Sequence, residues 1–429
     1  MSPAELLQRL IRFDTTNPPG NEAECVRFIA TLLHDAGIET KIVARDAERP
    51  NLIARLAGEG GAPGLLMQGH VDVVTTQGQQ WTHPPFEACI ADGFIWGRGA
   101  LDMKGGVAMM LTAFLRAHAA GAPRGDLMLA VLSDEEAGSA YGARYLVHEH
   151  PALFTGIRYA VGEFGGFTFE IAGRRFYPVQ VAEKGICQMR LHVRGQAGHG
   201  ALAARGGVTA GVAGMLRTLD EERLPVHVTE AARLMLNAIA RAVPPATRLV
   251  MRALLSPQLT DHTLNMLGER GGVFDPLLHN TANVTGIRAG ERINVIPSHA
   301  TLDIDGRLLP GMTSAEMIAE LRELLGVDFE VEMLADEPSP ATLDMGLFPT
   351  LADIVRQADP GGTPIPYLLG ASTDARFFSR LGIQCHGFLP MTLPAGFNFS
   401  RTIHAADERI PVEALEFGTH ALEEVVRRM

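Results

Sequence analysis

Apolar and polar residues along positions 1–181 follow helical and strand periods in alternation. Apolar positions recur every three to four residues near 3–13, and again from Asn21 until Gly37 provides a helix C-cap, so both stretches are predicted to be amphipathic helices. Almost wholly apolar runs, typical of buried strands, lie at 51–56, 64–74 and 126–135. This alternation predicts an α/β fold with helices on the faces of a sheet.

The pattern changes at about Ala182. Strict alternation over 185–195 predicts a half-exposed strand, and the following stretches favour strands and a helix in α+β order, at 292–311, 314–326 and 328–334. Residues 335–429 return to alternating strands and helices. We therefore predict a first domain made of 1–181 and 335–429, with a second domain inserted at 182–334.

Composition and charge narrow the class of protein. A chain of 429 residues exceeds the size at which one hydrophobic core stops growing, and a net charge of -12 argues against a nucleic-acid-binding surface. Four scattered cysteines without C-x-x-C fit a reducing compartment. With neither a secretory leader nor a long apolar run, we expect a cytoplasmic protein that does not enter the membrane.

Candidate chemistry lies where the apolar strands end. The segment LMQGHVDVV, residues 66–74, places His70 and Asp72 two residues apart, so both side chains project from one face of a strand. Alone, this pair also fits a polar strand end in solvent. Open α/β sheets place their sites at the carboxyl ends of strands, where Glu135 also falls.

Four further segments hold polar residues of the same kinds, namely Asp102, Asp134–Glu136, Glu163 and His404. Each has a structural alternative when taken alone. Asp102, set among glycines before a helix, fits a helix N-cap. The other acids fit solvated loops, and a lone histidine is usually structural.

Together these residues provide the donors of a paired-metal site. Divalent cations bind carboxylate and imidazole groups, and two ions of about +4 total charge are balanced by three carboxylates and a hydroxide. The predicted ligands are His70, Asp102, Glu136, Glu163 and His404. Asp72 is left to orient the His70 ring, and Glu135 to act as a base beside the metal-bound water.

The segments GHVDVV, GRGALDMKGG, DEEAGS, GEFGG and IHAADERI resemble, in kind and order, the motifs of the M20 family of zinc-dependent amidohydrolases and peptidases. That family includes aminoacylases, acetylornithine deacetylase, succinyl-diaminopimelate desuccinylase and glutamate carboxypeptidase. The resemblance covers nearly the whole chain. It implies a di-zinc exopeptidase-like catalytic domain with a mixed, mainly parallel sheet, and makes 182–334 a dimerisation or lid domain, so a homodimer is expected.

The resemblance also implies two Zn²⁺ per subunit, with Co²⁺ or Mn²⁺ as alternatives. It assigns His70, Asp102 and Glu163 to one ion and Asp102, Glu136 and His404 to the other, so that Asp102 bridges them. Glu135 is then the general base, which takes a proton from the bridging water and delivers it to the leaving amine.

Substrate contacts are implied in the same way. His199 would polarise the scissile carbonyl from across a dimer interface, and Arg307 would pair with a substrate carboxylate. The remaining implied contacts are Asn283 and, in the segment LLGASTDARFF, Gly370, Ser372 and Thr373. Taken alone, each of these residues also fits a structural role, such as a polar strand end or a turn before a helix.

The implied activity is hydrolysis of an amide bond in N-acyl amino acids or small peptides that carry a carboxylate near that bond. Glutamate at position 163 favours a deacylase or carboxypeptidase over the di- and tripeptidases. One departure is His83–Pro84, where relatives often carry aspartate. The alternatives are a metal-free binding or scaffold relative and a serine hydrolase; the latter is disfavoured because no G-x-S-x-G segment occurs.

Overall fold

Two compact units make up the chain, for which the computed structural model describes residues 1–202 and 205–429. Unit 1 comprises Met1–Val181, Asp344–Tyr367 and Thr373–Met429, and unit 2 comprises Ala182–Leu343 and Leu368–Ser372.

The end of unit 2 differs from the boundary expected at residue 334. Strand β15 (Glu330–Glu337) pairs along β10 (Gly185–Arg194) in one sheet, so the chain cannot leave this unit at residue 335. The short return at Leu368–Ser372 belongs to unit 2 because the Lys184 N–H lies 3.1 Å from the carbonyl of Leu369 and 3.2 Å from that of Ala371.

Unit 1 contains helices and strands in alternation. Its helices are α1 (Pro3–Ile11), α2 (Ala23–Asp35), α3 (Lys104–Ala120), α4 (Ala143–Glu149), α10 (Phe348–Ala358), α11 (Ala375–Ser379), α12 (Phe399–Thr402) and α13 (Val412–Arg428). Its strands are β1 (Thr40–Val43), β2 (Asn51–Leu56), β3 (Gly64–His70), β4 (Ile90–Ala91), β5 (Phe94–Trp96), β6 (Leu127–Leu132), β7 (Ile157–Gly162), β8 (Phe169–Ile171), β17 (Gln384–Gly387) and β18 (Arg409–Pro411). Strands β9 (Arg174–Glu183) and β16 (Thr363–Leu369) run from unit 1 into the first residues of unit 2.

The main sheet of unit 1 has the strand order β1-β2-β6-β3-β7-β17. The pairs β6–β3, β3–β7 and β7–β17 are parallel, whereas β1–β2 and β2–β6 are antiparallel. The prediction of a mixed, mainly parallel sheet is confirmed. Because β3 and β7 are parallel neighbours, the residues that follow them emerge at the same edge of the sheet.

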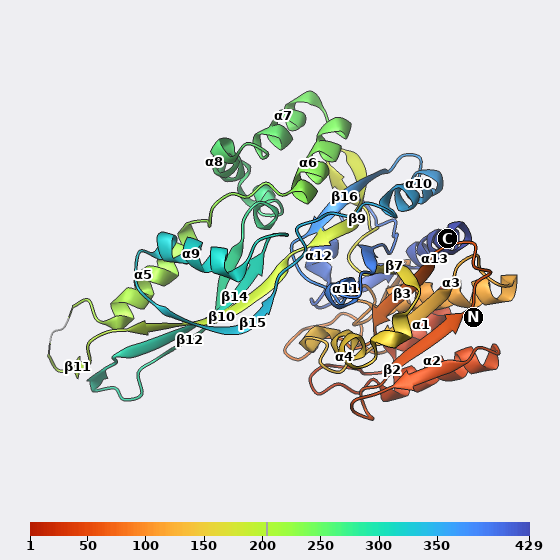
Figure 1. The fold of residues 1–429 in the computed structure, drawn as a ribbon, viewed down its shortest axis with the longest axis horizontal. Coiled ribbons are helices and arrows are strands. Elements are labelled where there is room, and N and C mark those ends of the chain that lie inside the picture. Colours follow the sequence, from red (N-terminus) through yellow and green to blue (C-terminus); the bar gives the residue numbers. More distant parts are fainter. Residues whose placement is uncertain (203–204) are drawn as a thin grey trace. The chain divides into compact units, whose positions relative to one another are not determined.

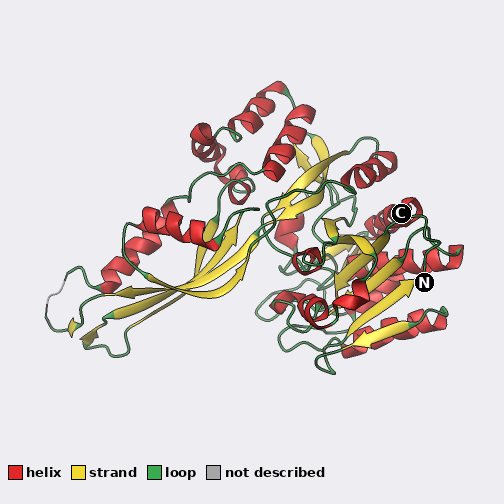
Figure 2. Cartoon of the chain, viewed as in Figure 1, coloured by secondary structure: helices red, strands yellow, loops and turns green. Residues whose placement is uncertain are grey.

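Helices cover both faces of this sheet, as Figure 2 shows for unit 1. Met67 and Leu129 belong to a core that includes residues of α1, α2, α3 and α13. Leu66 and Met128, their neighbours in sequence, face the other way and pack with α4 and α11. This alternation follows from the two-residue period of a strand. Unit 1 is therefore a three-layer α/β domain.

Unit 2 is an α+β domain. Its elements are β10, β11 (Gly198–His199), α5 (Val208–Glu221), α6 (Glu230–Ala242), α7 (Pro245–Ala253), α8 (Pro257–Leu267), β12 (Thr281–Ala289), β13 (Val295–Ile296), β14 (His299–Leu308), α9 (Ser314–Leu325) and β15 (Figure 1). The antiparallel sheet β12-β14-β10-β15 packs one face on α5 and α9 through residues such as Leu191 and Met317. Helices α6–α8 were not among the elements predicted from the hydrophobic pattern.

Among the residues that the structure describes, no helix has both the length and the apolar character needed to cross a bilayer.

Replacing Ile95 by alanine is expected to destabilise unit 1 by about 2–5 kcal/mol, the usual result of emptying a packed isoleucine site. Ile95 is fully buried on β5, whereas its cross-strand partner Ile90 on β4 is 54% exposed. Both tryptophans, Trp81 and Trp96, lie in unit 1, so urea unfolding followed by tryptophan fluorescence reports on this unit. The matched control Ile90→Ala is expected to stay within about 0.5 kcal/mol of the unaltered protein, and equal losses in the two variants would contradict the described packing.

Candidate metal centre

The carboxyl edge of the main sheet brings together residues that are far apart in sequence. His70 is the last residue of β3, and Glu163 directly follows β7, the parallel neighbour of β3. Asp102 lies just before α3, which packs against β3. Short connections after two adjacent strands and before one helix therefore place an imidazole and two carboxylates at one point.

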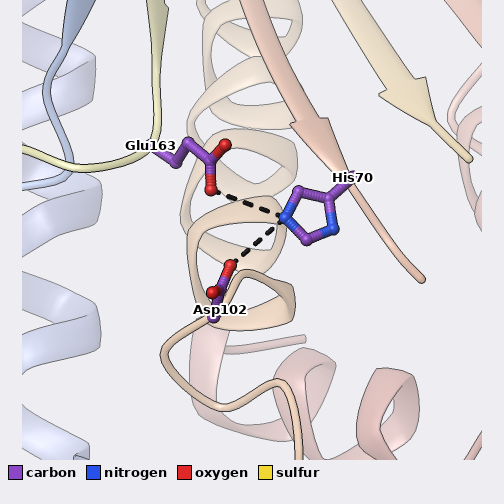
Figure 3. Close-up of side chains that lie close together, drawn as sticks. All are labelled: His70, Asp102 and Glu163. Atoms are coloured by element: carbon purple, nitrogen blue, oxygen red, sulfur yellow. Dashed lines mark hydrogen bonds and ion pairs between the residues drawn. The ribbon is translucent and has the colours of Figure 1, made fainter. Parts of the chain in front are cut away.

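His70, Asp102 and Glu163 form a first group of possible metal ligands. The Nε2 atom of His70 lies 3.2 Å from Oδ1 of Asp102 and 3.5 Å from Oε2 of Glu163. Figure 3 shows both carboxylates directed at this one ring nitrogen. All three side chains are buried, and one ligand atom from each lies within 4.8 Å of the others.

Asp102 also belongs to a second group, with Glu136 and His404. The Nε2 atom of His404 lies 3.0 Å from Oδ2 of Asp102 and 3.2 Å from Oε1 of Glu136. The two oxygens of Asp102 thus face two different histidines, Oδ1 toward His70 and Oδ2 toward His404. This is the arrangement of a carboxylate shared by two adjoining cation sites.

A tight turn after β6 separates the roles of neighbouring acids. Asp134 has a left-handed backbone, with φ of 69°, and a single 3-10 turn covers Glu135–Ala137. The Asp134 side chain points away from the two groups and pairs with Arg49 at 2.9 Å. Only Glu136 of this acidic segment joins a ligand group, and Glu135 stands next to it.

Asp72 holds this turn through its carboxylate. Its Oδ1 accepts the Glu135 N–H and its Oδ2 accepts the Glu136 N–H, both at 3.1 Å. The His70 ring nitrogen Nδ1 lies 3.0 Å from the backbone carbonyl of Asp72 and 3.4 Å from its carboxylate. The backbone of Asp72 therefore orients the ring more closely than its side chain does, and the side chain positions Glu135 and Glu136.

The pKa shifts of these groups reflect their crowding. Burial raises the pKa of Glu163 to about 8, although the His70 hydrogen bond opposes it. Burial, and then the charge of Glu163, raise the pKa of Glu135 well above its usual value. Burial would also raise the pKa of Asp102, but hydrogen bonds to His404 and His70 hold it well below its usual value. Hydrogen bonds to Asp102 and Glu136 raise the pKa of His404 to about 10.

This donor set fits a pair of divalent cations. Carboxylates and imidazoles are the ligands that zinc and similar ions take, and nearby positive charge relieves the repulsion between buried acids. In addition, Oε1 of Glu136 is buried and makes no hydrogen bond of acceptable geometry with the described residues, although His404 lies close to it. A carboxylate oxygen in this position is suited to bind a cation.

The candidate substrate residues of unit 2 lie on its four-stranded sheet and on the small two-stranded sheet β11-β13. Asn283 of β12 pairs with Asp305 of β14, two residues from Arg307 on the same face. The guanidinium of Arg307 already contacts the Asp305 carboxylate, at 3.1 Å. His199 is exposed on the short strand β11, and its Nδ1 accepts the Ala201 N–H at 3.1 Å.

The predicted carboxylate-binding loop has engaged hydroxyl groups. The Ser372 hydroxyl donates to the Lys184 carbonyl at 2.5 Å, and the Thr373 hydroxyl accepts the Ala375 N–H at 3.2 Å. Gly370 belongs to the same short return of the chain into unit 2 as Ser372, whereas Thr373 begins the next segment of unit 1. These hydroxyls have structural partners, so backbone N–H groups are the more suitable donors for a ligand.

Several supporting residues were not identified from the sequence. Glu408 accepts the Asp102 N–H at 3.1 Å, and Asn17 donates to both Asp72 and Asp134, at 2.9 and 3.0 Å. Asp374 accepts the Ser139 hydroxyl, which closes the far end of the turn that carries Glu135. The only sequence signal for Glu408 was its place in IHAADERI, and nothing in the sequence pointed to the long-range contacts of Asn17 or Asp374.

A mixed α/β sheet with two adjoining ligand groups at its carboxyl edge is the architecture of a dinuclear metal hydrolase. The chain matches the family described as Peptidase family M20/M25/M40 over residues 66–428. It belongs to this family, and the resemblance noted in its sequence motifs is confirmed.

Two relatives among characterised proteins illustrate the range of this family. The succinyl-diaminopimelate desuccinylase of Alkalilimnicola ehrlichii is 27% identical over 432 residues, which cover 99% of this chain and 98% of the relative. The N-fatty-acyl-amino acid synthase/hydrolase PM20D1 of Homo sapiens is 26% identical over 378 residues, which cover 83% and 73%. Both names describe enzymes, and this chain is accordingly a hydrolase of a metal-dependent family.

Solved structures share the whole fold. An M20 family metallo-carboxypeptidase, Sso-CP2 from Sulfolobus solfataricus, gives a TM-score of 0.74 at 17% identity and covers 100% of this chain and 99% of that chain. A dinuclear metal binding peptidase of the M20 family from Bacillus subtilis, YXEP, gives a TM-score of 0.59 at 13% identity, with 99% and 97% covered.

Replacing Arg49 by methionine is expected to cost about 3–5 kcal/mol, because it leaves buried carboxylates without their cation. Arg49 pairs with Glu22 at 2.7 Å as well as with Asp134, and all three side chains are less than 10% exposed. Urea unfolding of unit 1 by tryptophan fluorescence measures the loss.

The control is Arg55→Met. Arg55 pairs with Asp126, and both side chains are 34% exposed, so about 0–1 kcal/mol is expected for this pair. A loss at Arg49 no larger than the loss at Arg55 would show that the buried pair does not support the turn.

Proposed function

We propose that this protein is a di-zinc amidohydrolase that cleaves the amide bond of N-acyl amino acids or small peptides carrying a carboxylate near that bond. The observation that carries the proposal is the shared carboxylate, Asp102, between two ligand groups, with Glu135 beside one of the ligands. The relatives named as a desuccinylase and an N-fatty-acyl-amino acid hydrolase support this class of substrate.

The chain's own residues define where the ions would be held. His70, Asp102 and Glu163 would hold one, and Asp102, Glu136 and His404 the other. Carboxylate and imidazole donors suit Zn²⁺, with Co²⁺ or Mn²⁺ as alternatives. When bound, such a pair polarises a carbonyl group and makes water a stronger acid.

Glu135 is the proposed general base. The Asp72 carboxylate fixes its backbone N–H, and the left-handed residue Asp134 sets the direction of the turn. Glu135 then accepts a proton from the attacking water and returns it to the nitrogen of the leaving amine. The neighbouring residue Glu136 is engaged with His404, so the two acids need not compete for one task.

Arg307, Asn283 and His199 are the proposed substrate contacts of unit 2. Arg307 can exchange its Asp305 partner for a substrate carboxylate, since a guanidinium binds either in the same bidentate way. His199, exposed on the short strand β11, would polarise the scissile carbonyl oxygen. We propose further that unit 2 mediates homodimerisation and that His199 serves the partner subunit.

The loop at residues 370–373 is proposed to bind the same substrate carboxylate. Gly370, Ser372 and Thr373 would offer backbone N–H or hydroxyl donors, with the backbone N–H favoured at Ser372, whose hydroxyl already donates to the Lys184 carbonyl. Unit 1 would supply the general base for proton transfer and the metal ligands.

Glu135→Gln is expected to lower kcat for N-acyl amino acids by about 10²–10⁴, the usual contribution of a positioned base. The amide keeps the shape of the side chain but cannot carry the proton. Hydrolysis of a panel of N-acyl amino acids and dipeptides, with and without chelator, measures the effect, and elemental analysis is expected to find the same metal content as in the unaltered enzyme.

The control for this experiment is Glu149→Gln, since Glu149 is an exposed residue at the end of α4. It is expected to leave kcat unchanged. If Glu135→Gln retained near-full activity with metal bound, the assignment of the base would be wrong.

Arg307→Gln is expected to raise KM about 10- to 100-fold for substrates with a free carboxylate, which corresponds to the loss of a charge-assisted pair. Amidated analogues, which lack the charge, are expected to be affected far less. The ratio of KM values for each carboxylate–amide pair is the measurement.

Arg288→Gln is the matched control, because Arg288 lies on the same sheet and pairs with Asp303 while 64% exposed. An equal change for carboxylate and amide substrates in Arg307→Gln would refute a role in carboxylate recognition.

A further inference from the structure

Two members of the second ligand group, Asp102 and His404, come from the first and last segments of unit 1, and a chain of polar side chains, buried at Glu408 and Arg98 and half-buried at Gln79, joins their backbones. It begins at Glu408, which is fully buried. One oxygen of Glu408 accepts both the Leu101 N–H at 2.8 Å and the Asp102 N–H at 3.1 Å. Glu408 therefore holds the backbone of the shared ligand.

Arg98 continues the chain. Its NH1 group donates to the second oxygen of Glu408 at 2.5 Å, and its NH2 group donates to Oε1 of Gln79 at 2.8 Å. Arg98 is 1% exposed, and its guanidinium lies 5.2 Å from the ring centre of Trp81. A guanidinium buried in this way is held in one orientation, so it fixes where Gln79 lies relative to Glu408.

Gln79 completes the chain at His404. Its Nε2 donates to the His404 carbonyl at 2.8 Å, while its Oε1 is occupied by Arg98. The two ends of one amide are thus engaged on opposite sides, which leaves a single orientation of the side chain. Gln79 therefore bonds directly to the backbone of His404, a member of the second ligand group.

The position of His404 depends on this contact for two reasons, the exposure of its side chain and its backbone conformation. Its side chain is 48% exposed, so packing alone does not hold it. Its backbone φ is 60°, a left-handed conformation that is uncommon for a residue with a side chain. The pairing of β5 with β18 fixes the nearby chain only from Arg409 onward. Between that strand and His404, Thr82 also donates to Asp407, at 2.7 Å.

His70 and Glu163, the other members of the first group, depend on different supports. They follow the paired strands β3 and β7 in the middle of the main sheet and are nearly fully buried. In the part of the chain that the structure describes, the Gln79 side chain hydrogen-bonds to Arg98 and His404 and to neither of these two residues.

We propose that Gln79, anchored by Arg98, is a positioning residue that sets the place of His404, a member of the second ligand group and not of the first, and thereby sets the affinity of the second cation site. The proposal rests on the ligand assignment made above. Outer groups that orient metal ligands commonly contribute 10- to 100-fold to metal affinity.

The test is a cation titration of the metal-free full-length protein by isothermal calorimetry, with Co²⁺ absorption spectra recorded in parallel. For the unaltered protein, two binding steps with Zn²⁺ or Co²⁺ are expected. For Gln79→Leu, we expect the affinity of one step to fall about 10- to 100-fold, with a changed Co²⁺ spectrum for that step, while the other step stays within about threefold.

The matched control is Gln384→Leu. Gln384 is a buried glutamine of the same unit whose amide also joins two chain segments, with hydrogen bonds to Leu347 at 3.2 Å and Asp344 at 2.5 Å. It lies on β17, away from the ligand groups. Both steps are expected to be unchanged in this variant, although its unfolding temperature without metal is expected to fall at least as far as that of Gln79→Leu, because Gln384 is the more buried of the two.

His404→Ala distinguishes a failure of the ligand assignment from a failure of the positioning role of Gln79. If it abolishes one binding step and Gln79→Leu leaves both steps intact, the ligand assignment stands and the positioning role of Gln79 is refuted. If Gln79→Leu weakens both steps equally, the selective role is likewise refuted. If His404→Ala leaves both steps intact, the proposed ligand assignment itself fails.

Discussion

The main physical constraint on this structure is the repulsion between carboxylates that lie close together in one buried site. Asp102, Glu135, Glu136 and Glu163 meet at the carboxyl edge of the main sheet, where burial is the largest cause that raises the pKa of the three glutamates, whereas hydrogen bonds to His404 and His70 outweigh it at Asp102. Buried charges are tolerated only when they are paired, hydrogen-bonded or bound to metal. This arrangement therefore requires the imidazoles that face Asp102 and the cations that the family binds. The supporting contacts keep these acids in place.

The supports are of two kinds. Backbone geometry supplies one, since parallel strands β3 and β7 end side by side and deliver His70 and Glu163 to the same point. Buried side chains supply the other, because Asp72 and Glu408 accept backbone N–H groups of the residues that carry the acids. The carboxylates of Asp72 and Glu408 thus fix the backbone of other acidic residues. Such an arrangement is stable only if each supporting acid has its own donor, and Asn17 donates to Asp72 while Arg98 donates to Glu408.

Local sequence pattern predicted the elements that such a site requires, but not every boundary. The strand at residues 51–56 and the helix after Asp102 are found as expected, because their burial is reflected directly in runs of apolar residues. The end of unit 2 lies beyond residue 334, because β15 is exposed on much of its length and its pairing with β10 decides where it stops. Helices α6–α8 also went unpredicted; α7 and α8 bury few residues, but α6 buries six of its thirteen, so its burial was overlooked in the sequence pattern.

By itself the sequence determined the α/β class, the family motifs and the identity of the five candidate ligands, since metal chemistry restricts these positions to aspartate, glutamate and histidine. Only the tertiary structure decided that the two oxygens of Asp102 face different histidines, that Asp134 turns away toward Arg49, and that Gln79 reaches the backbone of His404. The physical reason is that residue type limits what a side chain can bind, whereas orientation depends on hydrogen bonds between segments up to 325 residues apart, which no local pattern records.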